Sequence, residues 1–260
     1  MGTIAGIVLF AALLYVLFRK SKKGKPKYSP DLSANWKNEL EKHVLFYHNL
    51  SVSDKPKFEN RILDFLASTR ITGVDTNVDE LDKLLVASSA IIPVFAFPEW
   101  KYFMLDEVLL YPDSFNERFE SNRGNKILGM VGSGYMEGKM ILSKSALRKG
   151  FSVDNDKQNV GIHEFTHLID KADGIVDGMP RTLIDKQFAI PWLDLMRKEL
   201  DKIHDGNSDI NPYGGIAPQE FFAVTAEYFF ERPMLFKRKH PELYNKLSQI
   251  FHTENNKPGK

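Results

Sequence analysis

Two histidines and a glutamate stand at a spacing that suits a metal-dependent hydrolase. His163, Glu164 and His167 form the sequence His-Glu-x-x-His. On a helix, residues four apart lie on the same face, so both imidazoles can reach one metal ion. Imidazoles are common ligands of Zn²⁺, and a glutamate beside that ion can take a proton from a bound water. The pattern predicts a zinc site with Glu164 as general base, although two structural histidines would share the same spacing.

A catalytic zinc site needs a third protein ligand beside one open position. The next histidine, His204, is too far along the chain to belong to the same contiguous motif. Glu220 and Glu227 lie in an apolar stretch that Pro218 is well suited to begin as a helix. The two glutamates are seven residues apart and therefore share a face. Spacing does not choose between them, and either could instead be a solvated helix glutamate.

Two further residues are candidates for supporting roles. Tyr213 lies in a stretch with Pro and Gly that predicts a loop entering the second helix. A loop tyrosine close to zinc can donate its hydroxyl to a developing oxyanion, although an ordinary packed aromatic is the alternative. Asp170 follows His167 by three residues. Its carboxylate lies on a nearby face, where it can orient a ligand histidine.

Apolar spacing divides the rest of the chain into helices, a small sheet and helices again. Helical periodicity is expected over residues 32–50, 53–68 and 79–91, and again from residue 159 onward. Short apolar runs bounded by Pro, Gly, Asp and Asn predict strands at residues 94–97, 107–112, 129–131 and 139–142. This order predicts a single α+β domain over residues 31–254, with a polar tail at residues 255–260.

The N-terminal segment is expected to anchor the chain in a membrane. Residues 3–18 carry no charge, and six of the nine residues 19–27 are Lys or Arg. The apolar run is at the short end for a spanning helix, and a basic flank is expected to stay in the cytoplasm. We therefore predict a transmembrane anchor at residues 1–18 and a basic linker at residues 19–30. The predicted localisation is single-pass in the inner membrane, with the N-terminus outside and the catalytic domain in the cytoplasm.

The composition excludes several classes of protein. The 260 residues include no cysteine, which rules out disulfides, thiolate zinc sites, iron–sulfur clusters and a cysteine nucleophile. A net charge of +1 gives no overall basic field for nucleic acid. We therefore expect no nucleic-acid partner. From the His-Glu-x-x-His sequence we expect one Zn²⁺ ion per chain.

The spaced motifs resemble those of the Mlc titration factor A family of glucose-regulated bacterial zinc metallopeptidases. The resemblance covers about residues 35–252 and is carried by His163-Glu164-x-x-His167-x-x-Asp170, Gly178-x-Pro180, Tyr213-x6-Glu220 and Glu227-Tyr228-Phe229-Phe230. It implies a zincin-like (gluzincin) domain with a small sheet and active-site helices, in which His163, His167 and Glu220 are the zinc ligands. It further implies that Glu164 is the general base and that Tyr213 donates a hydrogen bond to the oxyanion. Glu227 would contact a zinc ligand without binding the ion itself. The soluble members of the family lack the N-terminal anchor expected here.

The resemblance also implies aminopeptidase-type activity on short peptides, and the founding member binds the transcriptional repressor Mlc. We predict a membrane-anchored zinc peptidase that acts on a peptide or protein substrate. The alternative is a weakly catalytic or non-catalytic regulator that binds a repressor or another protein partner. The hairpin expected between Gly129 and Ser143 could offer substrate an exposed sheet edge, as zincins commonly do, or could lie inside the sheet.

Overall fold

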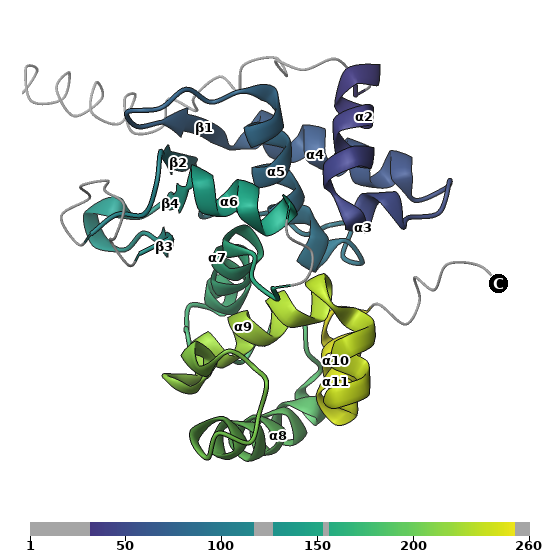
Figure 1. Ribbon diagram of the computed structural model, residues 1–260, viewed down its shortest axis with the longest axis vertical. Coiled ribbons are helices and arrows are strands. Elements are labelled where there is room, and N and C mark those ends of the chain that lie inside the picture. The colour runs from purple at the N-terminus through teal and green to yellow at the C-terminus, as the bar shows by residue number, and fades with distance from the viewer. Residues whose placement is uncertain (1–31, 117–126, 153–155, 253–260) are drawn as a thin grey trace, which may run out of the picture.

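A computed structural model describes residues 32–116, 127–152 and 156–252 (Figure 1). The α-helices are α2 (Ala34–His43), α3 (Leu45–His48), α4 (Lys55–Ser68), α5 (Glu80–Ile91), α6 (Lys144–Ser152), α7 (Val160–Asp170), α8 (Lys186–His204), α9 (Pro218–Glu231), α10 (Pro233–Lys239) and α11 (Pro241–Ile250). The strands are β1 (Arg70–Gly73), β2 (Glu107–Tyr111), β3 (Gly129–Val131) and β4 (Lys139–Ser143). Short 3₁₀ turns are η1 (Ile92–Val94), η2 (Gly134–Met136), η3 (Lys171–Asp173) and η4 (Pro212–Gly215).

The four strands form one mixed sheet in the order β1-β2-β4-β3. Strands β1, β2 and β4 are parallel, whereas β3 runs antiparallel to β4. Val108 of β2 lies opposite Met140 of β4, and both side chains are fully buried. The β3 strand is therefore at the end of the sheet, and β4 is internal.

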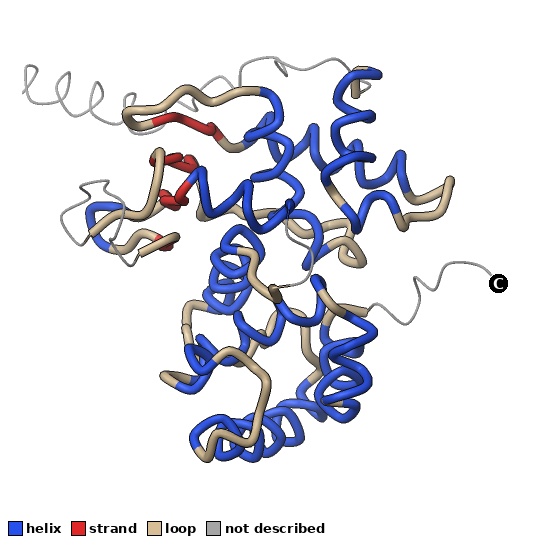
Figure 2. The backbone as a smooth tube through the Cα atoms, viewed as in Figure 1, coloured by secondary structure: helices blue, strands red, loops and turns tan. Residues whose placement is uncertain are grey.

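Helix α7 lies between two hydrophobic cores. The first core joins the sheet to α2–α6 and includes Ile162 and Phe165 of α7. The second core joins α8–α11 and includes Ile169 of the same helix. Figure 1 shows α7 at the boundary between these two parts, and Figure 2 shows that all the described strands lie on one side of it. The helix that carries the His-Glu-x-x-His sequence is thereby held from both sides, and the α+β class is confirmed.

The strand predicted at residues 94–97 is wrong. This segment continues η1 as a series of turns, in which Phe95 N–H donates to the Ile92 carbonyl and Phe97 N–H to the Val94 carbonyl. The side chain of Arg61 donates to the carbonyls of Val94 and Phe95. Because these backbone groups bond locally and to Arg61, they form no strand ladder.

Two other elements differ from those expected. The helix predicted over residues 32–50 is interrupted at Val44, whose extended backbone separates α2 from α3. The β1 strand was not predicted, because its sequence Arg-Ile-Thr-Gly has one large apolar residue and lies directly after α4. It is positioned by parallel pairing with β2, and a local pattern does not reveal such a long-range partner.

The predicted single-pass localisation in the inner membrane is corrected by the structure. Within the described ranges, no helix combines the length and the hydropathy that crossing a bilayer requires. The segments from which that prediction was made, residues 1–18 and 19–30, lie outside the described residues, as does the tail at residues 255–260.

The start of α5 is fixed by a buried carboxylate. Asp82 accepts from Asp79 N–H, and it also pairs with Arg148 at 2.7 Å and Lys144 at 2.9 Å on α6. Asp82 is fully buried, whereas its two cationic partners are partly exposed.

Replacing Asp82 with alanine is expected to lower the free energy of unfolding by about 1–3 kcal/mol, as measured by urea denaturation. The matched control is Glu80→Ala, which removes an exposed glutamate from the first turn of the same helix. An equal loss of stability in both variants would contradict this account of α5.

Candidate metal centre

The helix that presents the two histidines begins at a well-defined cap. Asn159 precedes α7 and its side-chain oxygen accepts from Ile162 N–H at 3.1 Å. The helix ends at Asp170, followed by η3 and by Gly174 in the left-handed conformation. His163 and His167 therefore lie one turn apart on the same face of a fully formed helix.

The structure brings His163, His167 and Glu220 together. The Nε2 atoms of the two histidines are 3.1 Å apart. Glu220 Oε2 is 3.2 Å from His163 Nε2 and 3.5 Å from His167 Nε2. Glu220 comes from the first turn of α9, which packs beside α7. Among the described residues these three form the only cluster of His, Asp or Glu side chains that could hold a metal ion.

Glu227 approaches the same histidine from the other side of its ring. Its Oε1 atom is 2.7 Å from His163 Nδ1, and its Oε2 atom accepts from Asn159 N–H at 2.6 Å. Glu227 therefore occupies Nδ1, so that Nε2 of His163 points toward Glu220 and His167. A histidine ligand whose second nitrogen is fixed in this way has a defined tautomer and ring orientation.

Glu164 is buried beside the end strand of the sheet. A Cβ atom on Gly129 of β3 would lie 2.6 Å from both Cγ and Oε1 of Glu164, so any side chain at this position would displace that carboxylate. The β3 backbone therefore passes directly over this carboxylate. No sequence motif marks Gly129 as part of the site, because its neighbour Glu164 is 35 residues away along the chain.

Tyr213 lies close to His163 and is partly exposed to solvent. It is on η4, just before α9, and its ring centroid is 6.0 Å from that of His163. Its side chain is half exposed, and its hydroxyl interacts with Glu220. Partial burial and the nearby carboxylates of Glu220 and Glu164 raise the pKa of the Tyr213 hydroxyl. The hydroxyl therefore stays protonated and can donate a hydrogen bond.

Asp170 has a different partner from the histidine that the sequence suggested. Its Oδ2 atom accepts from Gly178 N–H at 2.8 Å. Within the described part of the chain, neither imidazole hydrogen-bonds to this carboxylate. Asp170 thus joins the end of α7 to the loop that follows it.

Burial and close charged neighbours shift the pKa values of several groups in the site. Burial opposes protonation of His163, but Glu227 and Glu220 outweigh it and raise the pKa of His163 well above its ordinary value. Burial alone would raise the pKa of Glu220, but hydrogen bonds to the two histidines lower it to about 2. Burial raises the pKa of Glu164. Three carboxylates thus gather around two imidazoles in a largely buried space, so the site attracts positive charge.

This donor set fits a divalent metal ion. Two imidazole nitrogens and one carboxylate oxygen lie within 4.8 Å of one another. Both oxygens of Glu227 have other partners, Nδ1 of His163 and the N–H of Asn159. Two histidines and one glutamate are the protein ligands of several catalytic metal centres, which leave a further position open. The surplus of buried carboxylates supplies the compensating negative charge that a dication needs.

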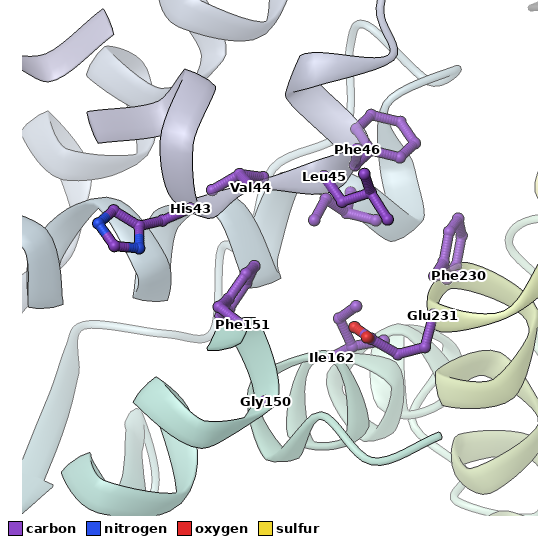
Figure 3. A pocket seen from close by; sticks show the side chains of 10 residues that line it. His43, Val44, Leu45, Phe46, Gly150, Phe151, Ile162, Phe230 and Glu231 are labelled. Atoms are coloured by element: carbon purple, nitrogen blue, oxygen red, sulfur yellow. The ribbon is translucent and has the colours of Figure 1, made fainter. Parts of the chain in front are cut away.

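A small pocket elsewhere in the molecule has no part in this cluster (Figure 3). Its walls come from the α2–α3 junction, from α6, and from Ile162 and Glu231 near the ends of α7 and α9. Neither histidine of the metal centre lines it, and most of its lining residues have apolar side chains.

Comparison with known proteins places the chain in a family. Residues 18–252 match the model of the glucose-regulated metallo-peptidase M90 family. A protein of Synechocystis described as uncharacterized is 28% identical over 240 residues, which are 87% of this chain and 86% of that protein. Mlc titration factor A of Escherichia fergusonii is 28% identical over 232 residues, which are 83% of this chain and 84% of that protein. Mlc titration factor A of an Enterobacter strain is 27% identical over 86% of this chain and 87% of that protein. The chain therefore belongs to the glucose-regulated metallo-peptidase M90 family.

Proposed function

We propose that this chain is a zinc-dependent peptidase, with His163, His167 and Glu220 as the metal ligands. The observation that carries the proposal is the convergence of these three donors beside the buried carboxylate of Glu164. Membership of a metallopeptidase family supports the same reaction class. Zn²⁺ suits a site of two imidazoles and one carboxylate, and when bound it supplies a Lewis acid that polarises a peptide carbonyl and acidifies a water.

The side chains of the site divide the remaining work. Glu164 takes a proton from the attacking water and delivers it to the leaving amine, as the general base and then the general acid. Tyr213 donates its hydroxyl to the oxyanion that forms on the substrate carbonyl. Glu227 holds the ring of His163 through Nδ1, so that its Nε2 remains directed at the metal.

The end strand of the sheet supplies a place for an extended peptide. Among the described strands, β3 pairs only with β4, and its backbone at Gly129 lies close to Glu164. A peptide that adds to the other edge of β3 would align its backbone beside the general base.

A second candidate function follows from the names of the relatives. Several are called Mlc titration factor A, and that name denotes an interaction with the protein Mlc. By this second candidate, the chain binds a regulatory protein partner, and hydrolysis is weak or absent. A variant that keeps the metal but lacks turnover separates the two functions, because partner binding would survive in it.

Replacing Tyr213 with phenylalanine tests the peptidase proposal. The loss of one oxyanion donor is expected to lower kcat by about 10²–10³-fold, with little change in KM for a chromogenic peptide substrate. The matched control is Tyr244→Phe, because Tyr244 packs against Phe229 and Phe236 in the second core. Wild-type kcat in the Tyr213 variant would remove this residue from the proposed mechanism.

A further inference from the structure

Three elements that surround the metal centre meet at Gly178. Its N–H donates to Asp170, the last residue of α7, at 2.8 Å. Its carbonyl accepts from Nε1 of Trp192 on α8, also at 2.8 Å. A Cβ added to it would meet the carbonyl of Pro218, the first residue of α9. One loop residue therefore connects the histidine helix to the helix that carries the third ligand.

Gly178 is required there for two separate reasons. Its φ of +75° is in the left-handed region, which side chains disfavour. A Cβ at this position would lie 2.3 Å from the Pro218 carbonyl oxygen, so any side chain would push α9 away. The approach between the loop and α9 is thus as close as the backbone allows.

The first turn of α9 packs against Gly178 at Pro218. The residue before the helix, Ala217, provides no side-chain cap. Glu220 lies two residues after Pro218, in the same turn. Further along α9, Glu227 is bonded to His163 on α7. The metal ligand Glu220 therefore lies between two links to α7, one at Glu227 and the other at Gly178.

Both side chains that hold Gly178 are buried. Asp170 is 1% exposed, and burial raises the pKa of its carboxyl to about 6. Trp192 is fully buried, and its ring packs against Phe221 and Phe222 of α9. A buried carboxylate is costly to keep. One oxygen of Asp170 accepts a hydrogen bond from the backbone N–H of Gly178. We attribute the presence of this buried carboxylate to the loop geometry that the bond fixes.

We propose that Asp170 is a positioning residue, which sets the distance between Glu220 and the two histidines through its hydrogen bond to Gly178. The inference rests on the proposed function, since it concerns the geometry of the zinc site. The hydrogen bond of Asp170 is to Gly178 rather than to one of the three proposed ligands. It acts through Gly178 and the Pro218 turn, with Trp192 as the second support of the same glycine.

The test is zinc affinity, measured on the full chain by competition with a chromophoric chelator. Asp170→Ala is expected to weaken zinc binding by roughly 10–100-fold, as is typical when the outer support of a metal site is removed. Asp170→Asn should stay close to wild type, because its amide oxygen can still accept from Gly178 N–H. Replacing zinc with Co²⁺ gives a second readout, and its visible absorption bands should change in Asp170→Ala but not in Asp170→Asn.

If Asp170 contributed only to stability, its loss would affect zinc binding no more than the loss of another buried carboxylate. Asp82→Ala is the control, because it removes another buried carboxylate, one that pairs with Arg148 rather than with Gly178. That variant should keep the wild-type zinc affinity and cobalt spectrum. If Asp170→Ala does not fold, Trp192→Phe is the second test, since it keeps an aromatic ring in the core and removes the donor to Gly178. Weaker zinc binding is then expected in Trp192→Phe.

The outcomes are distinguishable. Wild-type zinc affinity and an unchanged cobalt spectrum in both Asp170→Ala and Trp192→Phe would overturn the positioning role alone. A wild-type chain that binds no zinc would overturn the proposed function, and the positioning role with it.

Discussion

Replacing Glu164 with glutamine is expected to lower kcat for peptide hydrolysis by about 10²–10⁴-fold and to leave the zinc content unchanged. Glutamine has nearly the same shape, so it preserves the close contact with Gly129 of β3. Its amide cannot take a proton from the attacking water. Because Glu164 is not one of the three converging donors, zinc should remain bound. Steady-state kinetics and elemental analysis of the same preparation measure both quantities.

The control for this variant is Glu59→Gln. Glu59 is also a buried glutamate, but it accepts from the hydroxyl of Tyr47 in the first core. It should lose some stability and keep its turnover. Hydrolysis at the wild-type rate by the Glu164 variant would contradict the role of Glu164 as the base. Loss of turnover together with intact binding of a protein partner would favour the regulatory function.

Replacing Glu227 with alanine is expected to weaken zinc binding by roughly 10–100-fold. Its carboxylate is bonded both to Nδ1 of His163 and to the backbone N–H of Asn159. The variant leaves two buried polar groups without a partner and frees the His163 ring to rotate. Competition with a chelator measures the affinity, and Glu227→Gln should be intermediate because it keeps one oxygen acceptor.

The matched control is Glu231→Ala, one turn further along α9. Glu231 also accepts from Asn159, through the side-chain amide at 3.0 Å. The carboxylates bonded to the ring of His163 are instead those of Glu227 and Glu220. The variant should therefore lose stability without losing zinc affinity. Equal zinc affinities in the Glu227 and Glu231 variants would show that the bond to His163 does not matter.

The arrangement of the two histidines could be predicted from the sequence, because it depends only on local helix geometry. His163 and His167 are one turn apart on any α-helix, and α7 has a sequence that forms one. The choice between Glu220 and Glu227 could not be made from spacing, since both project from the same face of α9. The structure separates them by the ring nitrogen that each one approaches, Nε2 for Glu220 and Nδ1 for Glu227.

Long-range contacts account for most of what the sequence did not predict. Asp170 was expected to orient a ligand histidine, and that role stays a prediction. Its hydrogen bond to Gly178, which a loop brings back to the end of α7, was not expected. The apolar segment at residues 94–97 was expected to be a strand, but Arg61 from α4 binds its carbonyls. The N-cap role of Asn159 was within reach, since Asn before an apolar helix is a typical start signal. Its bond to Glu227 was not, because it joins residues 68 apart.

The central claim is that His163, His167 and Glu220 together hold a catalytic zinc ion. Elemental mass spectrometry of the purified chain tests it most directly, beside His163→Ala, Glu220→Ala and the control His204→Ala. We predict about one zinc per chain in the wild type and in the control, as a three-ligand catalytic site would take, and none in the two ligand variants. A folded wild-type chain that takes up no zinc after reloading, or a Glu220 variant that keeps the full zinc content, would contradict this account.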